Sequence, residues 1–353
     1  MTNITDNMPK VRTDSARGDT AFSDAARNDT AREASGVVAQ RRRMTFKDLL
    51  RAVRTRQWAK NGLIFAGFIF AGRLREPLGT IQLEATRVLL AFVCFCALSA
   101  AAYLINDWND IERDRLHPKK KDRPLASGVM STRTALMLIV MALGVAFVSA
   151  GMTVRLQPHA WGFAVAALFY FVLTLAYSFR LKHEVIIDVL CVAAGFVIRV
   201  VAGCLALPVL ISPWIIFCTF TLALFIALCK RRAELLEMGE GVSDTRRVLP
   251  LYSVPLLDTF IAIASGLTIT AYSLYTFNAP ASTALSPALH GKPLLMTTIP
   301  FVVYGVFRFL FLAHSSPVGG EPESMLRDKP LMINVGLWTL LVAALTVVEK
   351  LSL

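Results

Sequence analysis

Residues 87–114 read RVLLAFVCFCALSAAAYLINDWNDIERD. No charged side chain occurs between Arg87 and Asp107, and a helix of about 20 residues crosses a hydrocarbon core about 30 Å thick. Acidic side chains begin where this apolar run ends and recur up to Asp114. The stretch therefore predicts a membrane-spanning helix with a polar site at one of its ends.

The rest of the chain has the composition of a protein whose main solvent is lipid. It has 353 residues, of which 55% are hydrophobic, and its mean hydropathy is +0.55; soluble domains are less apolar. Apolar runs of about 18 to 22 residues predict an all-α polytopic membrane protein with nine transmembrane helices, or eight if the short first run does not span. The nine predicted spans are 58–72, 87–107, 134–152, 160–178, 185–206, 212–229, 254–276, 294–313 and 331–348.

The polar and charged residues predict the domain division and the topology. Residues 1–43 are polar and have no apolar period, which predicts a disordered cytosolic tail ahead of a membrane domain at 44–353. The net charge is +12, and Lys and Arg are concentrated in the loops after the even-numbered spans, with 16 there against 5 in the other loops. The positive-inside rule places those loops and the N-terminus in the cytosol. We therefore expect a multi-pass protein of the plasma (inner) membrane with a cytosolic site and no nucleic-acid partner.

The acidic motif has a spacing that suits a metal ion. Asn106, Asp110 and Asp114 lie four residues apart on one helical stripe, and Asp107 lies on its adjacent edge. Successive members are about 6 Å apart along the axis, so their carboxylates repel one another in a partly dry setting unless a cation is present. Mg²⁺ prefers hard oxygen ligands that leave positions for water and phosphate. The predicted metal ligands are Asp107, Asp110 and Asp114.

A simpler alternative is a solvated acidic helix end whose carboxylates pair with Arg113 and Arg115. The position of the acidic groups, directly at the end of a membrane span, favours function instead. The basic turn HPKKKDRP at 117–124 follows the motif. Its cations, including Lys119 and Arg123, suit phosphate groups, although a positive-inside loop explains part of the same charge.

At residues 106–124, the string NDWNDIERDRLHPKKKDRP resembles the first aspartate-rich motif, NDxxDxxxD with a basic RP turn, of the UbiA-type prenyltransferase superfamily. The resemblance implies nine transmembrane helices around a central cavity, with Mg²⁺ and phosphate groups at its cytosolic end. RQWAKN at 56–61 and KRRAEL at 230–235 are similar to motifs of its decaprenyl-phosphate phosphoribosyltransferase branch, as is YSFRLK at 177–182 with the later Asp188 and Arg199. Aromatic prenyltransferases usually carry a second DxxxD where this chain has Asp188 alone.

The resemblance implies Mg²⁺-dependent transfer of 5-phosphoribose from phosphoribosyl pyrophosphate to a polyprenyl phosphate, with release of pyrophosphate. The lipid phosphate is already an anion, so no general base is required. Asn106, Asp107, Asp110, Asp114 and Asp188 are the predicted catalytic residues. Arg56, Lys60 and Arg199 are candidates for the lipid phosphate. Arg199 shares a helical stripe with Asp188, so we expect both side chains to face the same cavity. The full set of predicted substrate contacts is Arg56, Lys60, Lys119, Arg123, Tyr177, Lys182, Arg199, Lys230 and Arg231.

Three other functions stay open at this point. The first is transfer of an isoprenyl chain from its diphosphate to an aromatic acceptor, which the lone Asp188 disfavours. The second is a transporter or channel, which the position of the carboxylates at one end of a span disfavours. The third is non-catalytic lipid binding, which needs no Mg²⁺ motif. The expected partners are the two phosphorylated substrates and the bilayer, and a homo-oligomer is possible.

Overall fold

The computed structural model describes residues 44–70, 77–116, 120–157, 159–207, 209–238, 248–278, 288–289, 292–315 and 327–351. The predicted tail, 1–43, lies outside them. In chain order the elements are α2 (Phe46–Ala52), η1 (Thr55–Phe65), α3 (Ala66–Phe70), α4 (Leu78–Asn109), α5 (Ile111–Leu116), α6 (Thr132–Leu156), α7 (Trp161–Phe179), η3 (Leu181–His183), α8 (Ile187–Leu205), α9 (Pro213–Met238), η4 (Leu249–Leu251), α10 (Val254–Asn278), β1 (Ala288–Leu289), β2 (Lys292–Pro293), η5 (Leu294–Thr298), α11 (Ile299–Ser315) and α13 (Lys329–Leu351).

The all-α fold class is confirmed, because the described chain is helical apart from the two-residue strands β1 and β2. Seven helices in the described ranges are long and apolar enough to cross a membrane: α4, α6, α7, α8, α9, α10 and the run of η5 with α11. They match seven predicted spans within about four residues, with two exceptions. Helix α4 begins at Leu78 and not at residue 87, and α9 ends at Met238 and not at residue 229, because the more polar stretches 78–86 (LGTIQLEAT) and 230–238 (KRRAELLEM) continue the two helices.

The first and last predicted spans differ from this pattern. The first corresponds to the 3₁₀ segment η1 followed by the short helix α3, and the described apolar part of α13, Lys329–Leu345, is shorter than the other spans. A Cβ added to Gly203 of α8 would lie 2.0 Å from the carbonyl oxygen of Ile64. The backbone of η1 therefore packs directly on α8. The count of nine transmembrane helices stays a prediction.

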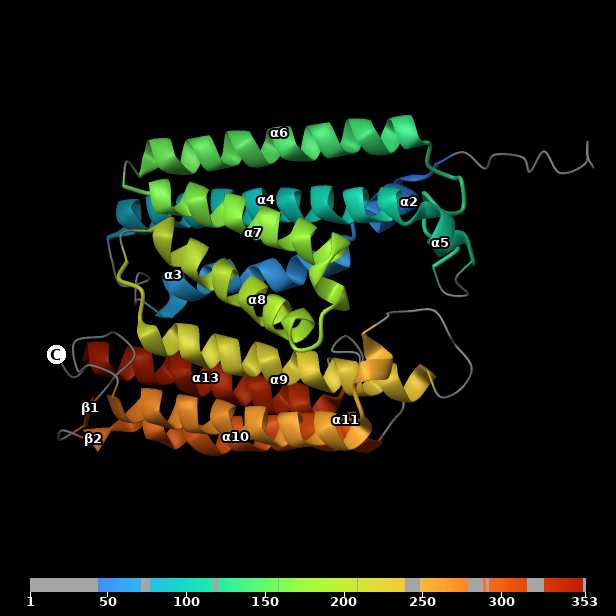
Figure 1. Cartoon of the computed structure of the whole chain (residues 1–353). Helices are drawn as coiled ribbons and strands as arrows, with labels where there is room; N and C mark the ends of the chain where they lie inside the picture. The colour runs from blue at the N-terminus through green and yellow to red at the C-terminus, as the bar shows by residue number, and fades with distance from the viewer. Residues whose placement is uncertain are drawn as a thin grey trace, which may run out of the picture. The chain divides into compact units, whose positions relative to one another are not determined.

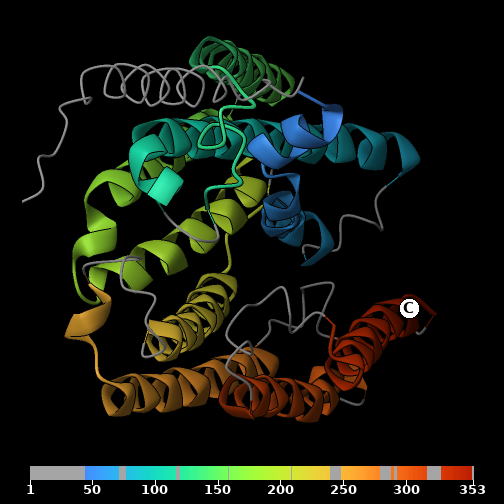
Figure 2. The same cartoon turned by 90° about the vertical axis from the view of Figure 1, so that its right-hand side faces the viewer.

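Two hydrophobic clusters hold the described helices together. One joins η1, α3, α4, α6, α7 and α8 around side chains such as Phe95 and Phe163. The other joins α8 to α9, α10, α11 and α13 around side chains such as Phe225 and Leu257. Figure 1 and the end view in Figure 2 show α8 lying between the two groups of helices. Since α8 packs on α7, η1 and α9, it connects the two halves of the membrane domain.

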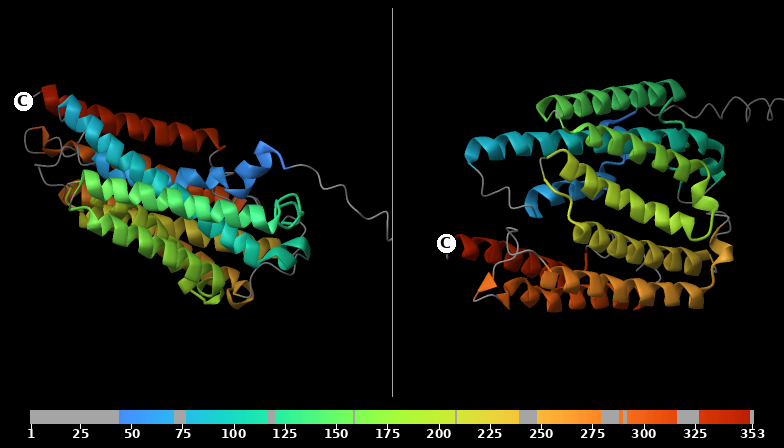
Figure 3. Two further views of the ribbon diagram at one scale, coloured as in Figure 1. Left: turned by 90° about the horizontal axis from the view of Figure 1, so that it is seen from above. Right: turned by 60° about the vertical axis from the view of Figure 1, so that its left-hand side comes forward.

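The polar segments gather at one end of the helices. The elements α5, η3 and η4, which follow α4, α7 and α9 in the chain, lie at this end together with α2, whereas the β1–β2 hairpin lies at the opposite end (Figures 1 and 3). The connections after spans two, four and six therefore share one side, as the charge pattern predicts. The acidic motif lies on that side, at the α4–α5 junction.

Candidate functional site

The acidic motif keeps its helical spacing across a break between two helices. Helix α4 ends at Asn109, Asp110 follows with φ −98° and ψ 11°, and α5 begins at the next residue. The amide of Asp110 donates to the carbonyl of Asn106 at 3.0 Å, and the amide of Asp114 donates to the carbonyl of Asp110 at 2.8 Å. The predicted four-residue spacing is therefore present in the backbone.

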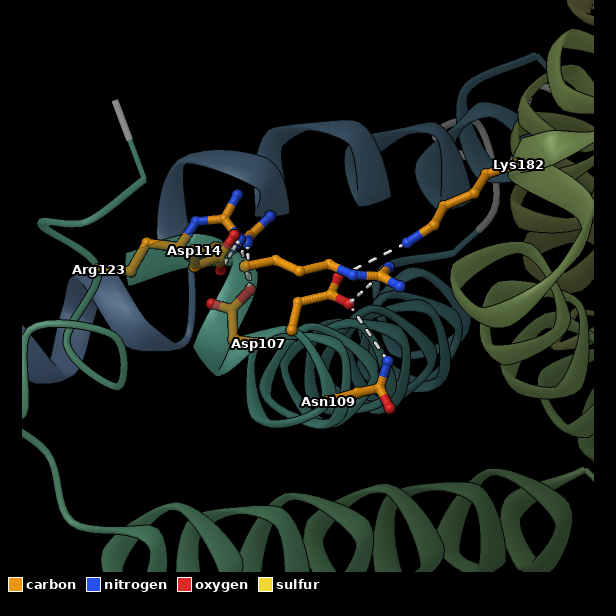
Figure 4. Close-up of polar contacts among 8 residues, drawn as sticks. Asp107, Asn109, Asp114, Arg123 and Lys182 are labelled. Atoms are coloured by element: carbon orange, nitrogen blue, oxygen red, sulfur yellow. Dashed lines mark hydrogen bonds and ion pairs between the residues drawn. The ribbon is translucent and has the colours of Figure 1, made fainter. Parts of the chain in front are cut away.

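The side chains group differently from the predicted stripe. Arg123 Nη1 lies 3.0 Å from Asp107 Oδ1 and 2.6 Å from Asp114 Oδ2, so one guanidinium bridges two carboxylates seven residues apart. Both carboxylate side chains are buried, whereas that of Arg123 is 26% exposed. Figure 4 shows Asp107 and Asp114 directed at Arg123. The basic RP turn therefore contacts the acidic motif directly.

Asp110 faces a different set of partners. Lys182 Nζ lies 3.6 Å from its Oδ2, and Asn109 donates to its Oδ1 at 3.2 Å; Figure 4 shows Lys182 reaching in from the side away from Arg123. Arg113 lies 4.0 Å from the same carboxylate. These ion pairs are long, so Asp110 is held less tightly than the other two acidic side chains. Sequence reasoning placed Lys182 at the phosphate site, and the fold brings it to the motif.

Arg54 belongs to this site although it was not among the predicted site residues. Its Nη2 lies 2.6 Å from Asp107 Oδ1, and its guanidinium carbon lies 4.5 Å from the centre of the Tyr103 ring, one helical turn before Asp107. The residue has the left-handed conformation, φ 51°, immediately before η1. The branch motif that RQWAKN resembles begins RxxQW, and the first arginine of that pattern falls on Arg54, three positions before Gln57, so the sequence did contain the signal. Of the residues predicted in this segment, Arg56 is exposed and Lys60 is half-buried.

A second polar cluster surrounds Asp188 at the start of α8. Its carboxylate is fully buried and receives Arg231 Nε at 2.7 Å on Oδ2 and the Tyr252 hydroxyl at 2.8 Å on Oδ1. Arg231 also donates to Tyr177 Oη at 3.2 Å and pairs with Glu234. The fold therefore brings three predicted residues, Tyr177, Asp188 and Arg231, into one network.

Tyr252 was missed as a site residue and completes this cluster. The amide of Ile186 donates to its hydroxyl oxygen at 2.7 Å, and Ile186 has φ 69°, which is strained for a β-branched residue. Burial, and then the hydrogen bond to Asp188, raise the pKa of Tyr252 to about 12. The phenol is therefore protonated at neutral pH and donates to the carboxylate. The predicted contact Lys230 is 43% exposed and lies 4.0 Å from Glu234.

Arg199 lies in a third network, inside the membrane domain. It donates to Asn61 Oδ1, to the carbonyl of Gly195 and to Tyr170 Oη, each at 2.7 Å, and Tyr170 Oη lies 3.0 Å from Ser99 Oγ. In the described part of the chain no carboxylate contacts this guanidinium. A membrane-buried cation whose partners are all neutral is a candidate for binding an anion.

The acidic motif has the donor types for Mg²⁺ but not the finished geometry. Over the described ranges, no group of three or more His, Cys, Asp or Glu side chains is arranged to hold a metal ion as it stands. Asp107, Asp110 and Asp114 supply the carboxylate oxygens that Mg²⁺ prefers, while Arg123 bridges two of them. The residues therefore fit the ion once a guanidinium contact opens. Lys119, predicted as a phosphate contact, lies outside the described residues.

Comparison with known proteins gives matches over most of the chain. The profile described as the UbiA prenyltransferase family matches residues 63–321. The decaprenyl-phosphate phosphoribosyltransferase of Mycolicibacterium smegmatis is 32% identical over 294 residues, which cover 82% of this chain and 89% of the relative. The protein of the same name from Corynebacterium glutamicum is 30% identical and covers 82% and 84%.

The fold is also similar to solved structures. A UbiA homolog from Archaeoglobus fulgidus bound to GPP and Mg²⁺ superposes with a TM-score of 0.60 at 19% identity, and the match covers 85% of this chain and 99% of that one. A digeranylgeranylglyceryl phosphate synthase gives a TM-score of 0.57 at 16% identity over 87% and 99% of the two chains. At these identities the likeness concerns the fold alone.

Proposed function

Because the chain belongs to the UbiA prenyltransferase family, we propose that this integral membrane transferase moves 5-phosphoribose from phosphoribosyl pyrophosphate to a polyprenyl phosphate. The C1–O bond to pyrophosphate breaks, pyrophosphate leaves with the electron pair, and a lipid phosphate oxygen forms the new bond to C1. Relatives that bear the name of this activity match most of the chain, which supports the assignment. The expected location is the plasma membrane, with the site on the cytosolic side.

The contacts of the Asp188 carboxylate are the observation that favours phosphoribosyl transfer over prenyl transfer. One of its oxygens receives Arg231 and the other receives Tyr252. Because Asp188 and Arg231 are both buried, a second metal ion would have to break an unsolvated ion pair. A prenyltransferase with two aspartate-rich motifs needs carboxylates at both. Here the second segment carries Asp188 and, four residues earlier, the exposed Glu184 in place of a second aspartate, and Asp188 already has two partners. The position therefore supports a transferase that uses a single metal-binding motif.

We assign the Mg²⁺ ligands to Asp107, Asp110 and Asp114, with Asn106 beside them. The ion supplies charge neutralisation of the pyrophosphate as it leaves. Arg123 and Lys182 lie within ion-pair reach of these carboxylates, which supports their assignment to the phosphate groups of the sugar donor. The incoming lipid phosphate needs positioning and no deprotonation.

Arg199 is our candidate for a second anion. Ser99, which contacts its network, precedes Asp107 on α4 by about 12 Å at 1.5 Å per residue. An anion bound by Arg199 thus lies deeper along α4 than the Mg²⁺ ligands. The lipid phosphate is the anion that the resemblance implies there, and the 5-phosphate of the donor has the same chemistry. The variant Arg199→Gln distinguishes the two anions. A higher KM for polyprenyl phosphate alone would assign the lipid phosphate to Arg199, and a higher KM for phosphoribosyl pyrophosphate alone would assign the 5-phosphate.

The test is an assay of the purified full chain in detergent with two substrate pairs. Labelled phosphoribosyl pyrophosphate with polyprenyl phosphate should give organic-phase label that depends on Mg²⁺. A parallel reaction offers labelled isoprenyl diphosphates with aromatic acceptors, since the fold shared with a homolog solved with GPP favours prenyl transfer as the second candidate. Label that moves only in the parallel reaction would overturn the proposal.

A further inference from the structure

A single carboxylate oxygen at the candidate site carries two arginine contacts. Asp107 Oδ1 lies 2.6 Å from Arg54 Nη2 and 3.0 Å from Arg123 Nη1. Arg123 reaches Asp114 as well, at 2.6 Å. Two carboxylates and two guanidinium groups therefore cancel each other in charge before any ligand arrives.

Mg²⁺ cannot be added to this arrangement without a change in it. The ion needs oxygen ligands at about 2.0–2.1 Å in near-octahedral geometry. An ion on Asp107 Oδ1 would lie close to two guanidinium groups that hold the same oxygen, and like charges at such separations repel strongly in a partly buried setting. One of the two arginine contacts has to open first.

Arg54 is better placed to leave than Arg123. Arg123 bridges two carboxylates. Among the residues that the structure describes, Arg54 forms an ion pair with Asp107 only, and the Arg54 side chain is 25% exposed. The ring of Tyr103 lies 4.5 Å from its guanidinium carbon. Because a cation over an aromatic face is attracted to it, Arg54 can leave the carboxylate and still remain beside the site.

We propose that Arg54 is an exchangeable counterion of the acidic motif, which gives up Asp107 to the metal and turns to the pyrophosphate of the substrate. This inference rests on the proposed function, since it assumes that the acidic motif binds a metal and a pyrophosphate. It predicts that the metal alone binds weakly, because it has to displace a cation. Pyrophosphate then strengthens metal binding, because the released guanidinium gains an anionic partner.

The test measures Mn²⁺ binding to the full chain in detergent by electron paramagnetic resonance, with and without inorganic pyrophosphate. We expect Arg54→Gln to bind Mn²⁺ alone about two- to fivefold more tightly than the parent chain, the range for a partly exposed ion pair. Pyrophosphate should then enhance Mn²⁺ binding less in the variant than in the parent. Arg54→Lys, which keeps the charge, should behave more like the parent.

Arg308→Gln is the matched control. The Arg308 side chain is 27% exposed and lies 2.8 Å from Asp328, whose side chain is 14% exposed, so the variant removes a similar ion pair away from the acidic motif. Its Mn²⁺ binding should equal that of the parent. Circular dichroism of each variant, and the charge-preserving Arg54→Lys, separate a change in binding from a failure to fold.

Two outcomes overturn the inference, and they differ in what else they overturn. If Arg54→Gln binds Mn²⁺ alone no more tightly than Arg308→Gln, or loses nothing of the pyrophosphate enhancement, Arg54 is not the exchangeable counterion and the proposed activity still stands. If Asp107→Asn binds Mn²⁺ as tightly as the parent chain does, both with and without pyrophosphate, the metal is not at this motif. The metal role in the proposed function then fails together with the inference.

Discussion

Removal of Arg231 from its pair with Asp188 should destabilise the protein far more than removal of its sequence neighbour. Asp188 is fully buried and the Arg231 side chain is 2% exposed, with Nε and Oδ2 2.7 Å apart. In Arg231→Gln, the Tyr252 hydroxyl is the charge-neutral donor that still reaches the carboxylate. Loss of one partner of a buried ion pair costs about 3–5 kcal/mol. We expect the free energy of unfolding to fall by that amount.

Arg232→Gln is the control for this experiment. Arg232 is the next residue of α9 and pairs with Asp258 at 2.5 Å, but the Asp258 side chain is 39% exposed. Water therefore solvates that carboxylate after the change, and exposed pairs contribute about 1 kcal/mol or less. A difference of several kcal/mol between the two variants follows mainly from burial, because helix, residue type and substitution are the same.

Equilibrium unfolding of both variants in mixed detergent and SDS micelles, followed by circular dichroism, gives the two free energies. A double variant, Asp188→Leu with Arg231→Met, removes both charges and should recover most of the loss. Equal losses for Arg231→Gln and Arg232→Gln would refute the reasoning, as would a double variant no more stable than Arg231→Gln. Turnover of the double variant then separates a role in folding from a role in substrate binding.

Three further changes test the metal motif, the second cluster and the packing of η1. Asp110→Asn, which removes one carboxylate with long ion pairs, should abolish Mg²⁺-dependent turnover while the unfolding midpoint stays at the parent value; retained turnover would exclude Asp110 as a metal ligand. Tyr252→Phe removes the hydroxyl that donates to buried Asp188 and should lower stability by about 1–3 kcal/mol, and no measurable loss in SDS unfolding would count against that bond. Gly203→Ala places a methyl 2.0 Å from a carbonyl oxygen of η1 and should cost about 1–3 kcal/mol, whereas Gly266→Ala, whose methyl meets nothing within 4 Å, should not destabilise.

Features that depend on local geometry could be predicted from the sequence. A helix fixes which residues recur on one face, so the apolar runs predicted seven spans within a few residues, apart from the early start of α4 at Leu78 and the late end of α9 at Met238. The four-residue spacing of Asn106, Asp110 and Asp114 persists in the backbone across the α4–α5 junction for the same reason. The local pattern also places the Lys182 turn on the side of the acidic motif, because both follow even-numbered spans.

Features that depend on contacts between distant segments could not be predicted in this way. Arg54 reaches Asp107 from 53 positions away in the sequence, and Tyr252 reaches Asp188 across 64; no periodicity encodes either contact. The pairing of Asp107 with Asp114 through Arg123 depends on how the chain after α5 returns to the motif. The close packing of η1 on Gly203 likewise joins Ile64 to a residue of another helix.

Exposure separates the two ionic clusters at this end of the protein into different roles. In the first, the arginine side chains of Arg54 and Arg123 are 25% and 26% exposed, so water can solvate either one while it changes partners, and exchange for a metal or phosphate is inexpensive. In the second, Arg231 is 2% exposed and Asp188 is fully buried, so opening the pair leaves two unsolvated charges. We therefore propose that ligand exchange takes place at the α4–α5 junction, whereas the buried pair of Asp188 with Arg231 joins α8 to α9.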